Sequence, residues 1–159
     1  MREDLAQIAE TLLDYAENGK TFQTDKITTV PSGVYTDTDL WQKEMDAVFK
    51  KLPLALAAST ELPEPGNYKA MEAVGLPILI TRDKDGQAHA FLNVCAHRGA
   101  PVADEGCGHK SRFTCKYHGW TYTNDGKLIG VAEAHTFGDI DKSTRGLTAL
   151  PCEEKSGLI

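Results

Sequence analysis

Two short motifs combine cysteine with histidine, and together they offer the ligands of a metal cluster. Cys95-x-His97 and Cys115-x-x-His118 each provide one thiolate and one imidazole, and 17 residues separate the two motifs. Two irons that share two sulfides need four protein ligands, two for each iron. When two cysteines hold one iron and two histidines hold the other, the centre is of the Rieske [2Fe–2S] type, with a potential of roughly −150 to +300 mV. The spacing therefore predicts a centre that moves single electrons.

The residues around each motif predict a strand that leads into a loop with a glycine. Residues 91–94 (FLNV) and 112–114 (RFT) have the composition of short strands. Gly99 follows the first motif and Gly119 follows the second. Because glycine allows a close approach of the backbone, we expect the two loops to close on a cluster from opposite sides.

Two other interpretations of these residues stay open. Cys107-x-His109 repeats the first motif, but only five residues lie between it and Cys115, and residues 105–108 are typical of a turn. A set of two cysteines and two histidines also suits a tetrahedral zinc ion, which would make the chain a zinc-binding interaction module. Zinc fingers usually carry an H-x₃₋₅-H pair on a helix, and the sequence has no such pair.

The chain from residue 54 onward predicts short strands joined by turns. The sequences DKDG (83–86) and NDG (124–126) are hairpin turn signals. Three hairpins are expected: 77–81 with 88–94, 121–123 with 127–131, and 147–150 with 157–159. These elements predict a small antiparallel β-sandwich with the metal loops at one end.

The N-terminal part predicts two helices. Residues 2–17 carry apolar side chains at i, i+3 and i+4, and Gly19 suits the end of that helix. A second helix is expected from Thr38, whose side chain can cap it, to the residues before Pro53. This helical arm either contacts a partner or covers an edge of the sheet.

The composition excludes some classes of partner. With 41% hydrophobic and 25% charged residues, the chain has the make-up of a soluble protein. No run of 18 apolar residues predicts a transmembrane helix, and the N-terminus lacks the apolar stretch of a secretory signal. The net charge of −6 argues against nucleic acid, which needs a basic surface. We therefore expect neither membrane nor nucleic acid among the partners.

Residues 91–102 (FLNVCAHRGAPV) and 113–122 (FTCKYHGWTY) resemble the Rieske domain of the large (alpha) subunit of ring-hydroxylating oxygenases. Residues 62–68 (LPEPGNY) and the Asp125-Gly126 turn are similar to the same family. The resemblance runs from about Tyr35 to the end of the chain. The two cluster motifs are its specific part.

The resemblance implies a mostly β fold, a Rieske-type antiparallel β-sandwich at 53–159 preceded by an N-terminal helical arm at 1–52. It implies that the [2Fe–2S] cluster is bound by Cys95, His97, Cys115 and His118. Three further residues are expected next to these ligands: Arg98, Tyr117 and Trp120. Arg98 either orients a carboxylate near the cluster or forms a surface ion pair. Tyr117 and Trp120 either cover the cluster or belong to the core.

The resemblance also implies a role in an oxidoreductase. Such a subunit receives electrons from a ferredoxin or flavin reductase and passes them to a mononuclear non-haem Fe(II) in a catalytic domain, within a trimer-like homo-oligomer. We expect that iron site to be absent from this chain, because His89, His109 and His135 are isolated, so no catalytic residue is assigned. A free-standing Rieske ferredoxin is the alternative. The N-terminal arm, and a strand that we expect to be unfinished at Ile159, favour the oxygenase.

The cysteines favour a reducing compartment. Respiratory-complex Rieske domains carry a disulfide between two positions that hold Ala100 and Tyr117 here. Since this clamp is absent, we expect the oxygenase or ferredoxin branch and a cytoplasmic location.

Overall fold

The structure is a computed structural model that describes residues 3–24 and 26–159, and these fall into two compact units. One unit ends at Trp41 and the other runs from Gln42 to Ile159. Helix α1 (Glu3–Glu17) confirms the first predicted helix, and its apolar side chains Leu5, Ile8 and Leu12 are more than half exposed. Within these described residues, no helix is both long and apolar enough to cross a membrane.

The second helix forms as predicted but begins with a different cap. Helix α2 (Thr38–Glu44) continues as a π-helical turn over Met45–Phe49. The carboxylate of Asp37 accepts hydrogen bonds from the backbone N–H groups of Asp39 (2.9 Å) and Leu40 (3.0 Å). The prediction that Thr38 caps the helix was therefore wrong, because the aspartate one residue earlier already satisfies the first free N–H groups.

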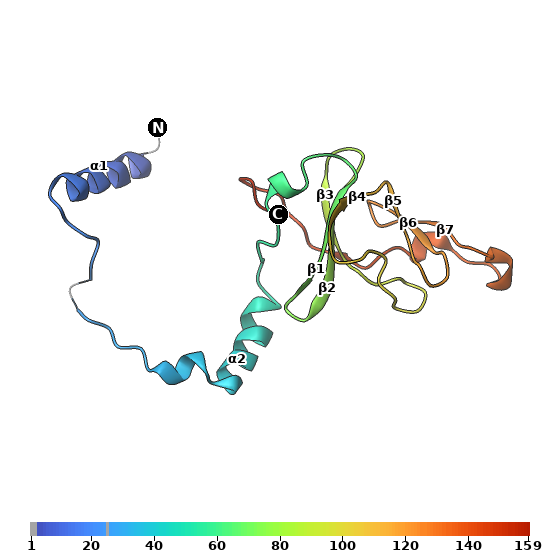
Figure 1. Ribbon diagram of the computed structural model, residues 1–159, viewed down its shortest axis with the longest axis horizontal. Coiled ribbons are helices and arrows are strands. Elements are labelled where there is room, and N and C mark those ends of the chain that lie inside the picture. The colour runs from blue at the N-terminus through green and yellow to red at the C-terminus, as the bar shows by residue number, and fades with distance from the viewer. Residues whose placement is uncertain (1–2, 25) are drawn as a thin grey trace. The chain divides into compact units, whose positions relative to one another are not determined.

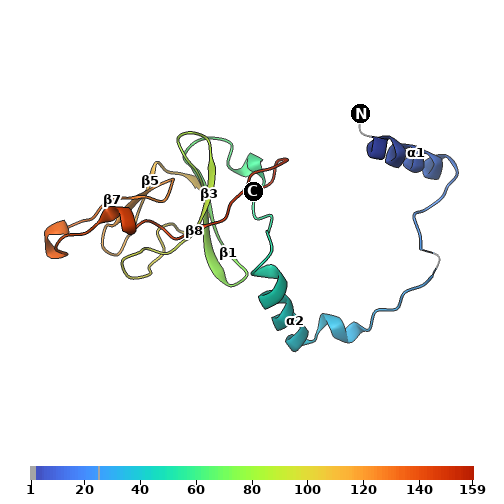
Figure 2. The same ribbon diagram turned by 180° about the vertical axis from the view of Figure 1, so that it is seen from behind.

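The second unit consists of two antiparallel sheets, which confirms the predicted fold class (Figures 1 and 2). The larger sheet has the strand order β4-β1-β2-β3-β8, and the smaller has the order β5-β6-β7. The strands are β1 (Asn67–Ala73), β2 (Leu76–Arg82), β3 (Ala88–Leu92), β4 (Gly106–His109), β5 (Arg112–Thr114), β6 (Thr121–Thr123), β7 (Leu128–Gly130) and β8 (Ala149–Leu150). Short 3₁₀ turns lie at Ser32–Tyr35, Ser59–Glu61, Ala134–Thr136 and Lys142–Thr144.

Two of the three predicted hairpins are confirmed, and the third is wrong. β2 pairs with β3, and β6 pairs with β7, around the expected turns. β8 instead pairs with β3, where Leu150 lies opposite Ala90. Residues 157–159 return to Ala57, whose carbonyl accepts from the N–H of Ile159 at 2.9 Å. β8 is too short to continue a hairpin, because Pro151 follows and has no N–H to donate.

The segment around Cys107 is a strand rather than the predicted turn. β4 pairs with β1 at the edge of the larger sheet, with Tyr68 opposite Gly108. A Cβ on Gly108 would lie only 2.8 Å from the Tyr68 ring. Glycine is therefore required here so that the tyrosine ring can lie across the edge strand.

The core between the sheets is set by the alternation of side chains along β2. Leu79 packs in the same buried cluster as Phe91, Phe113 and Tyr122, so it faces the smaller sheet. Its neighbours on β2, Ile78 and Ile80, belong to a second buried cluster on the other face, with Leu62 and Ile159. The larger sheet is thus covered on both faces, and the smaller sheet packs on one of them.

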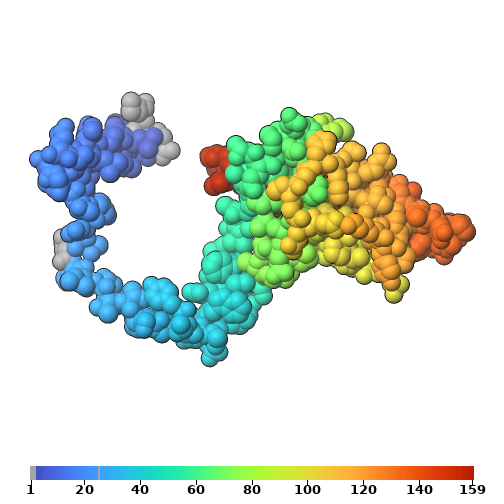
Figure 3. Space-filling model, viewed as in Figure 1, coloured from blue at the N-terminus to red at the C-terminus, as the bar shows by residue number. Residues whose placement is uncertain are grey.

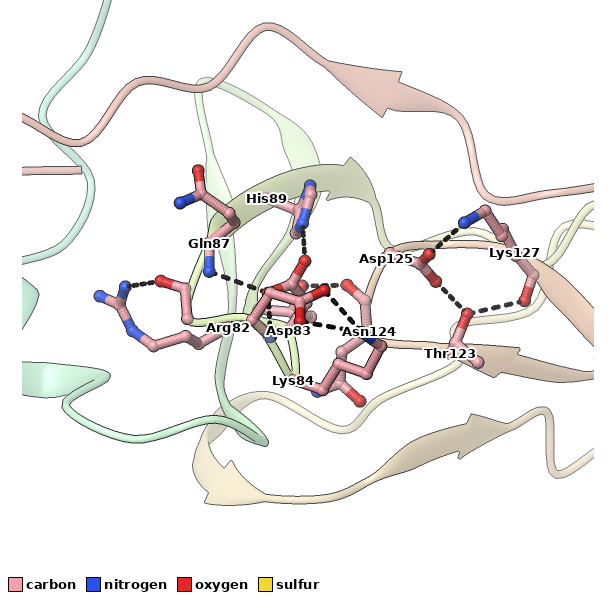
Figure 4. A network of polar contacts seen from close by, with 12 residues as sticks. Arg82, Asp83, Lys84, Gln87, His89, Thr123, Asn124, Asp125 and Lys127 are labelled. Atoms are coloured by element: carbon pink, nitrogen blue, oxygen red, sulfur yellow. Dashed lines mark hydrogen bonds and ion pairs between the residues drawn. The ribbon is translucent and has the colours of Figure 1, made fainter.

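Polar contacts join the turn of the first hairpin to that of the second (Figure 4). The Thr81 hydroxyl donates to the Asn124 carbonyl at 2.6 Å, and both residues are buried. Asp83 lies 2.8 Å from the His89 ring nitrogen and accepts from the N–H of Gln87. The turns of both hairpins are therefore fixed by tertiary contacts as well as by their own sequence. Beyond β7, the chain protrudes from the end of the second unit (Figure 3).

Asn93 fixes the path of the chain on either side of the first metal loop. Its buried side chain accepts from the N–H groups of Val102 (3.0 Å) and Ala103 (3.1 Å) and donates to the Ala103 carbonyl at 2.8 Å.

We predict that Asn93→Ala lowers the free energy of unfolding by about 3 kcal/mol, since it leaves buried backbone groups unpaired. Gln87→Ala, on an exposed side chain of the same unit, should change it by less than about 0.5 kcal/mol. Chemical denaturation measures both. Equal effects of the two substitutions would show that water replaces the Asn93 side chain.

A buried arginine ties β2 to the C-terminal segment. The Arg82 guanidinium donates to both carboxylate oxygens of Glu154 at 2.9 Å and to the Gly86 carbonyl at 2.7 Å. The hydrogen bonds from Arg82 to the carboxylate, followed by the contribution of Ser59, lower the pKa of Glu154 to about 2 from its usual 4.5.

Because the folded pKa is depressed, this pair stabilises the fold fully above about pH 4.5, and the contribution is lost as the pH falls towards about 2. We predict that Glu154→Gln flattens the decline of the melting temperature over this window. Glu72→Gln, on the exposed side of β1, is the control and should retain the parent slope. A parent slope in Glu154→Gln would show that the ion pair does not contribute.

Candidate metal centre

The two motifs form loops with the same backbone hydrogen bonds. In loop 1 (95–100) and loop 2 (115–120), the cysteine N–H donates at 2.8 Å to the carbonyl five residues later. The glycine N–H donates back to the cysteine carbonyl, at 3.0 Å in loop 1 and 2.9 Å in loop 2. Gly99 and Gly119 have φ angles of +79° and +66°, in the left-handed region that favours glycine. The prediction of two glycine-containing loops is confirmed.

Each sheet supplies one of the loops. β3 of the larger sheet leads into loop 1, and β5 of the smaller sheet leads into loop 2. Cys95 and Cys115 are both 3% exposed, both are free thiols, and both belong to the core cluster between the sheets. Burial raises the pKa of the Cys95 thiol, and the neighbouring Cys115 raises it further. Coordination to a metal ion would offset the free-energy cost of a negatively charged thiolate in this apolar site.

The two histidines lie side by side nearer the surface. The ring centroids of His97 and His118 are 4.6 Å apart, with an interplanar angle of 69°, and both side chains are half-buried. Desolvation lowers the pKa of His97, and the nearby His118 and Arg98 charges act in the same direction. A lowered pKa keeps the imidazole neutral at physiological pH, which is the form that binds metals.

Aromatic rings cover His97 on its inner side. The Trp120 ring stacks on His97 with a centroid distance of 5.0 Å and an angle of 9°. Phe137, from the segment after β7, meets the His97 ring edge-on at 5.2 Å. Trp120 is 4% exposed, and its indole N–H has no hydrogen-bond partner among the described residues. This free donor, beside a candidate ligand, fits a site built to receive a group with acceptor atoms.

The other expected neighbours lie on the outer side. The Tyr117 ring centroid is 3.9 Å from that of His118, and Tyr117 is 61% exposed. The Arg98 guanidinium lies over the Tyr117 ring, 5.6 Å from its centroid. Trp120 is therefore a core aromatic, whereas Tyr117 is a surface ring next to a candidate ligand.

Tyr122 is a contact of the site that the sequence reasoning missed. It is fully buried on β6, and its hydroxyl lies 3.2 Å from the Cys95 sulfur. The same hydroxyl accepts from the N–H of Ala96 at 3.0 Å. Burial and the hydrogen bond to Cys95 raise the pKa of Tyr122, so the hydroxyl stays protonated. The signal was the alternation of β6, which points Tyr122 inward from a strand directly after loop 2.

The remaining cysteines and histidines lie apart from the loops. His89 pairs with Asp83, and His109 contacts the Pro65 carbonyl at 3.0 Å. The other three, Cys107, His135 and Cys152, are exposed on β4, on a 3₁₀ turn and near the C-terminus. In the described part of the chain, no three His, Cys, Asp or Glu side chains group around one ion position. The candidate ligands lie instead as a pair of thiols and a pair of imidazoles, which fits a two-iron cluster.

Comparison with known proteins also indicates a Rieske [2Fe–2S] domain. Residues 53–144 match the model of the Rieske [2Fe-2S] domain family. The alpha subunit of chlorobenzene dioxygenase from Cupriavidus sp. (strain PS12) is 41% identical over 110 residues, which are 69% of this chain and 24% of that protein. The alpha subunit of benzene 1,2-dioxygenase from Pseudomonas putida is 38% identical over 127 residues, which are 79% of this chain and 28% of that protein.

Solved structures share the fold. Naphthalene 1,2-dioxygenase from Rhodococcus sp. is 30% identical with a TM-score of 0.73, over 99% of this chain and 34% of that one. The apo form of a quaternary ammonium Rieske monooxygenase is 34% identical with a TM-score of 0.73, over 82% of this chain and 38% of that one. The chain spans about a quarter of the length of the two curated relatives. The chain belongs to the Rieske [2Fe-2S] domain family, and its homologues are the corresponding portions of oxygenase alpha subunits.

Proposed function

We propose that Cys95, His97, Cys115 and His118 hold the Rieske [2Fe–2S] cluster, with the two thiolates on one iron and the two imidazoles on the other. The observation that supports this most directly is the sorting of the four side chains, thiols buried and imidazoles near the surface. When bound, the cluster supplies one-electron chemistry at roughly −150 to +300 mV.

The residues around the proposed ligands have separate roles in the site. The core between the sheets keeps water from the two thiols, and the Tyr122 hydroxyl donates towards Cys95 from within that core. Trp120 and Phe137 shield one side of His97. The half-buried imidazoles are the part of the site nearest to the surface, so they are the route by which an electron enters or leaves.

We further propose a place for the chain in a larger enzyme. It acts as the electron-transferring part of a ring-hydroxylating oxygenase alpha subunit, with residues 1–52 as an arm and 53–159 as the Rieske domain. A ferredoxin or flavin reductase donates the electrons, and a mononuclear iron in a catalytic domain of a trimer-like oligomer receives them. The alpha-subunit relatives support this role, and the free thiols of Cys107 and Cys152, the two cysteines outside the proposed ligand set, support a cytoplasmic location.

The cluster assignment is tested by visible absorption and by the EPR spectrum of the reduced protein. We predict that protein produced with iron is red-brown and shows the spectrum of mixed cysteine and histidine ligation. Four substitutions should each abolish both signals: Cys95→Ser, His97→Ala, Cys115→Ser and His118→Ala.

The matched controls are Cys107→Ser, Cys152→Ser and His109→Ala, which should leave both signals intact because these side chains lie apart from the loops. Stoichiometric zinc in a colourless protein would contradict the proposal. So would a cluster that survives Cys95→Ser and is lost in Cys107→Ser.

Tyr122→Phe should lower the reduction potential by about 40 mV, the one-electron equivalent of about 1 kcal/mol for a lost hydrogen bond. A hydrogen bond to a cysteine sulfur favours the more negative, reduced state. Redox titration followed by visible absorption measures the shift. Tyr68→Phe is the control, because it removes a hydroxyl from the same core cluster, and among the described residues that hydroxyl forms no hydrogen bond with either thiol. An unchanged potential in Tyr122→Phe would show that the hydroxyl does not stabilise the reduced state.

A further inference from the structure

On the side of the site that faces the surface, loop 1 and loop 2 make a contact to which the proposed function assigns no role. Arg98 belongs to loop 1 and Tyr117 belongs to loop 2, and the guanidinium carbon lies 5.6 Å from the centre of the tyrosine ring. A cation at this distance from an aromatic face is attracted by the ring quadrupole. The contact therefore joins the loops at the surface, outside the ring contact between His97 and His118.

In the described part of the chain, the charge of Arg98 lies over an aromatic ring and not beside a carboxylate. Among the described residues, no acidic oxygen lies within ion-pair distance of its guanidinium. Lys116, the residue before Tyr117, does form such a pair, with Asp104 at 2.5 Å. Of the two interpretations of Arg98 from the sequence, neither an oriented carboxylate nor a surface ion pair is found in the described residues.

Tyr117 is in turn placed against a candidate ligand. Its ring lies 3.9 Å from that of His118, centroid to centroid, although more than half of its surface is exposed. The described contacts of this ring are with His118 and with the Arg98 guanidinium. The order of contacts is thus Arg98, Tyr117, His118, which runs from one loop to the ligand of the other.

We propose that Arg98 and Tyr117 are positioning residues that latch the two loops together over His118 and slow the loss of the cluster to solvent. The proposal rests on the proposed function, since it requires the cluster to be bound between these loops. The buried contacts of Tyr122 and Trp120 hold the inner side of loop 1. The contact between Arg98 and Tyr117 holds the loops together on the outer side, where a chelator or water would first reach the proposed ligands.

The test follows the decay of visible absorption of the cluster-bearing protein in the presence of EDTA. Arg98→Gln and Tyr117→Leu should each accelerate the decay about two- to fivefold, the range expected for an exposed cation–π contact. The double variant should decay no faster than the faster single variant, because each change removes the same contact. Tyr117→Phe keeps the ring face and should restore the parent rate. In the single variants, the EPR signal should broaden, since His118 is held less uniformly.

The matched control is Arg112→Gln, which removes an equal charge from an exposed arginine on β5. It should keep the parent rate and linewidth. The proposal would be wrong if the accelerations of decay in the two single variants multiplied in the double variant. It would also be wrong if both single variants decayed at the parent rate. A parent protein that never forms the cluster would refute the proposed function instead, so the two failures are distinguishable.

Discussion

The burial of two thiols where the sheets meet is the constraint on which the rest of this protein depends. Cys95 and Cys115 are almost completely buried, and an apolar surrounding disfavours the thiolate form that binds iron. The Tyr122 hydroxyl lies 3.2 Å from the Cys95 sulfur, and it comes from the opposite sheet. The core must therefore be tight enough to exclude water and yet carry one polar group at a fixed place.

This constraint explains why the architecture is a sandwich rather than a single sheet. Loop 1 leaves the larger sheet and loop 2 leaves the smaller, so the packing between the sheets sets the separation of the proposed ligands. Phe113 and Tyr122, both fully buried, lie in that packing layer together with the thiols. Core side chains such as Leu79, which belongs to the same cluster as the two thiols, thus help to set the distance between the sheets.

The site could be predicted from the sequence because its signals are local. The Cys and His pairs, the glycines after them and the strands before them lie within a few residues of each other. The hairpins at 83–86 and 124–126 were equally local. What could not be predicted rests on partners distant in the chain. β4 forms because Gly108 leaves room for the Tyr68 ring, and β8 pairs with β3 rather than with 157–159. The Tyr122 contact with Cys95 joins residues 27 positions apart.

The supply of one loop by each sheet has a practical consequence. In a chain whose sheets have not packed against each other, the two pairs of proposed ligands are not brought together, so it has secondary structure but no complete site. In the cluster-bearing protein, colour is accordingly a measure of tertiary structure. The ratio of visible to ultraviolet absorbance counts the correctly folded fraction of a preparation, a quantity that circular dichroism of the backbone cannot provide.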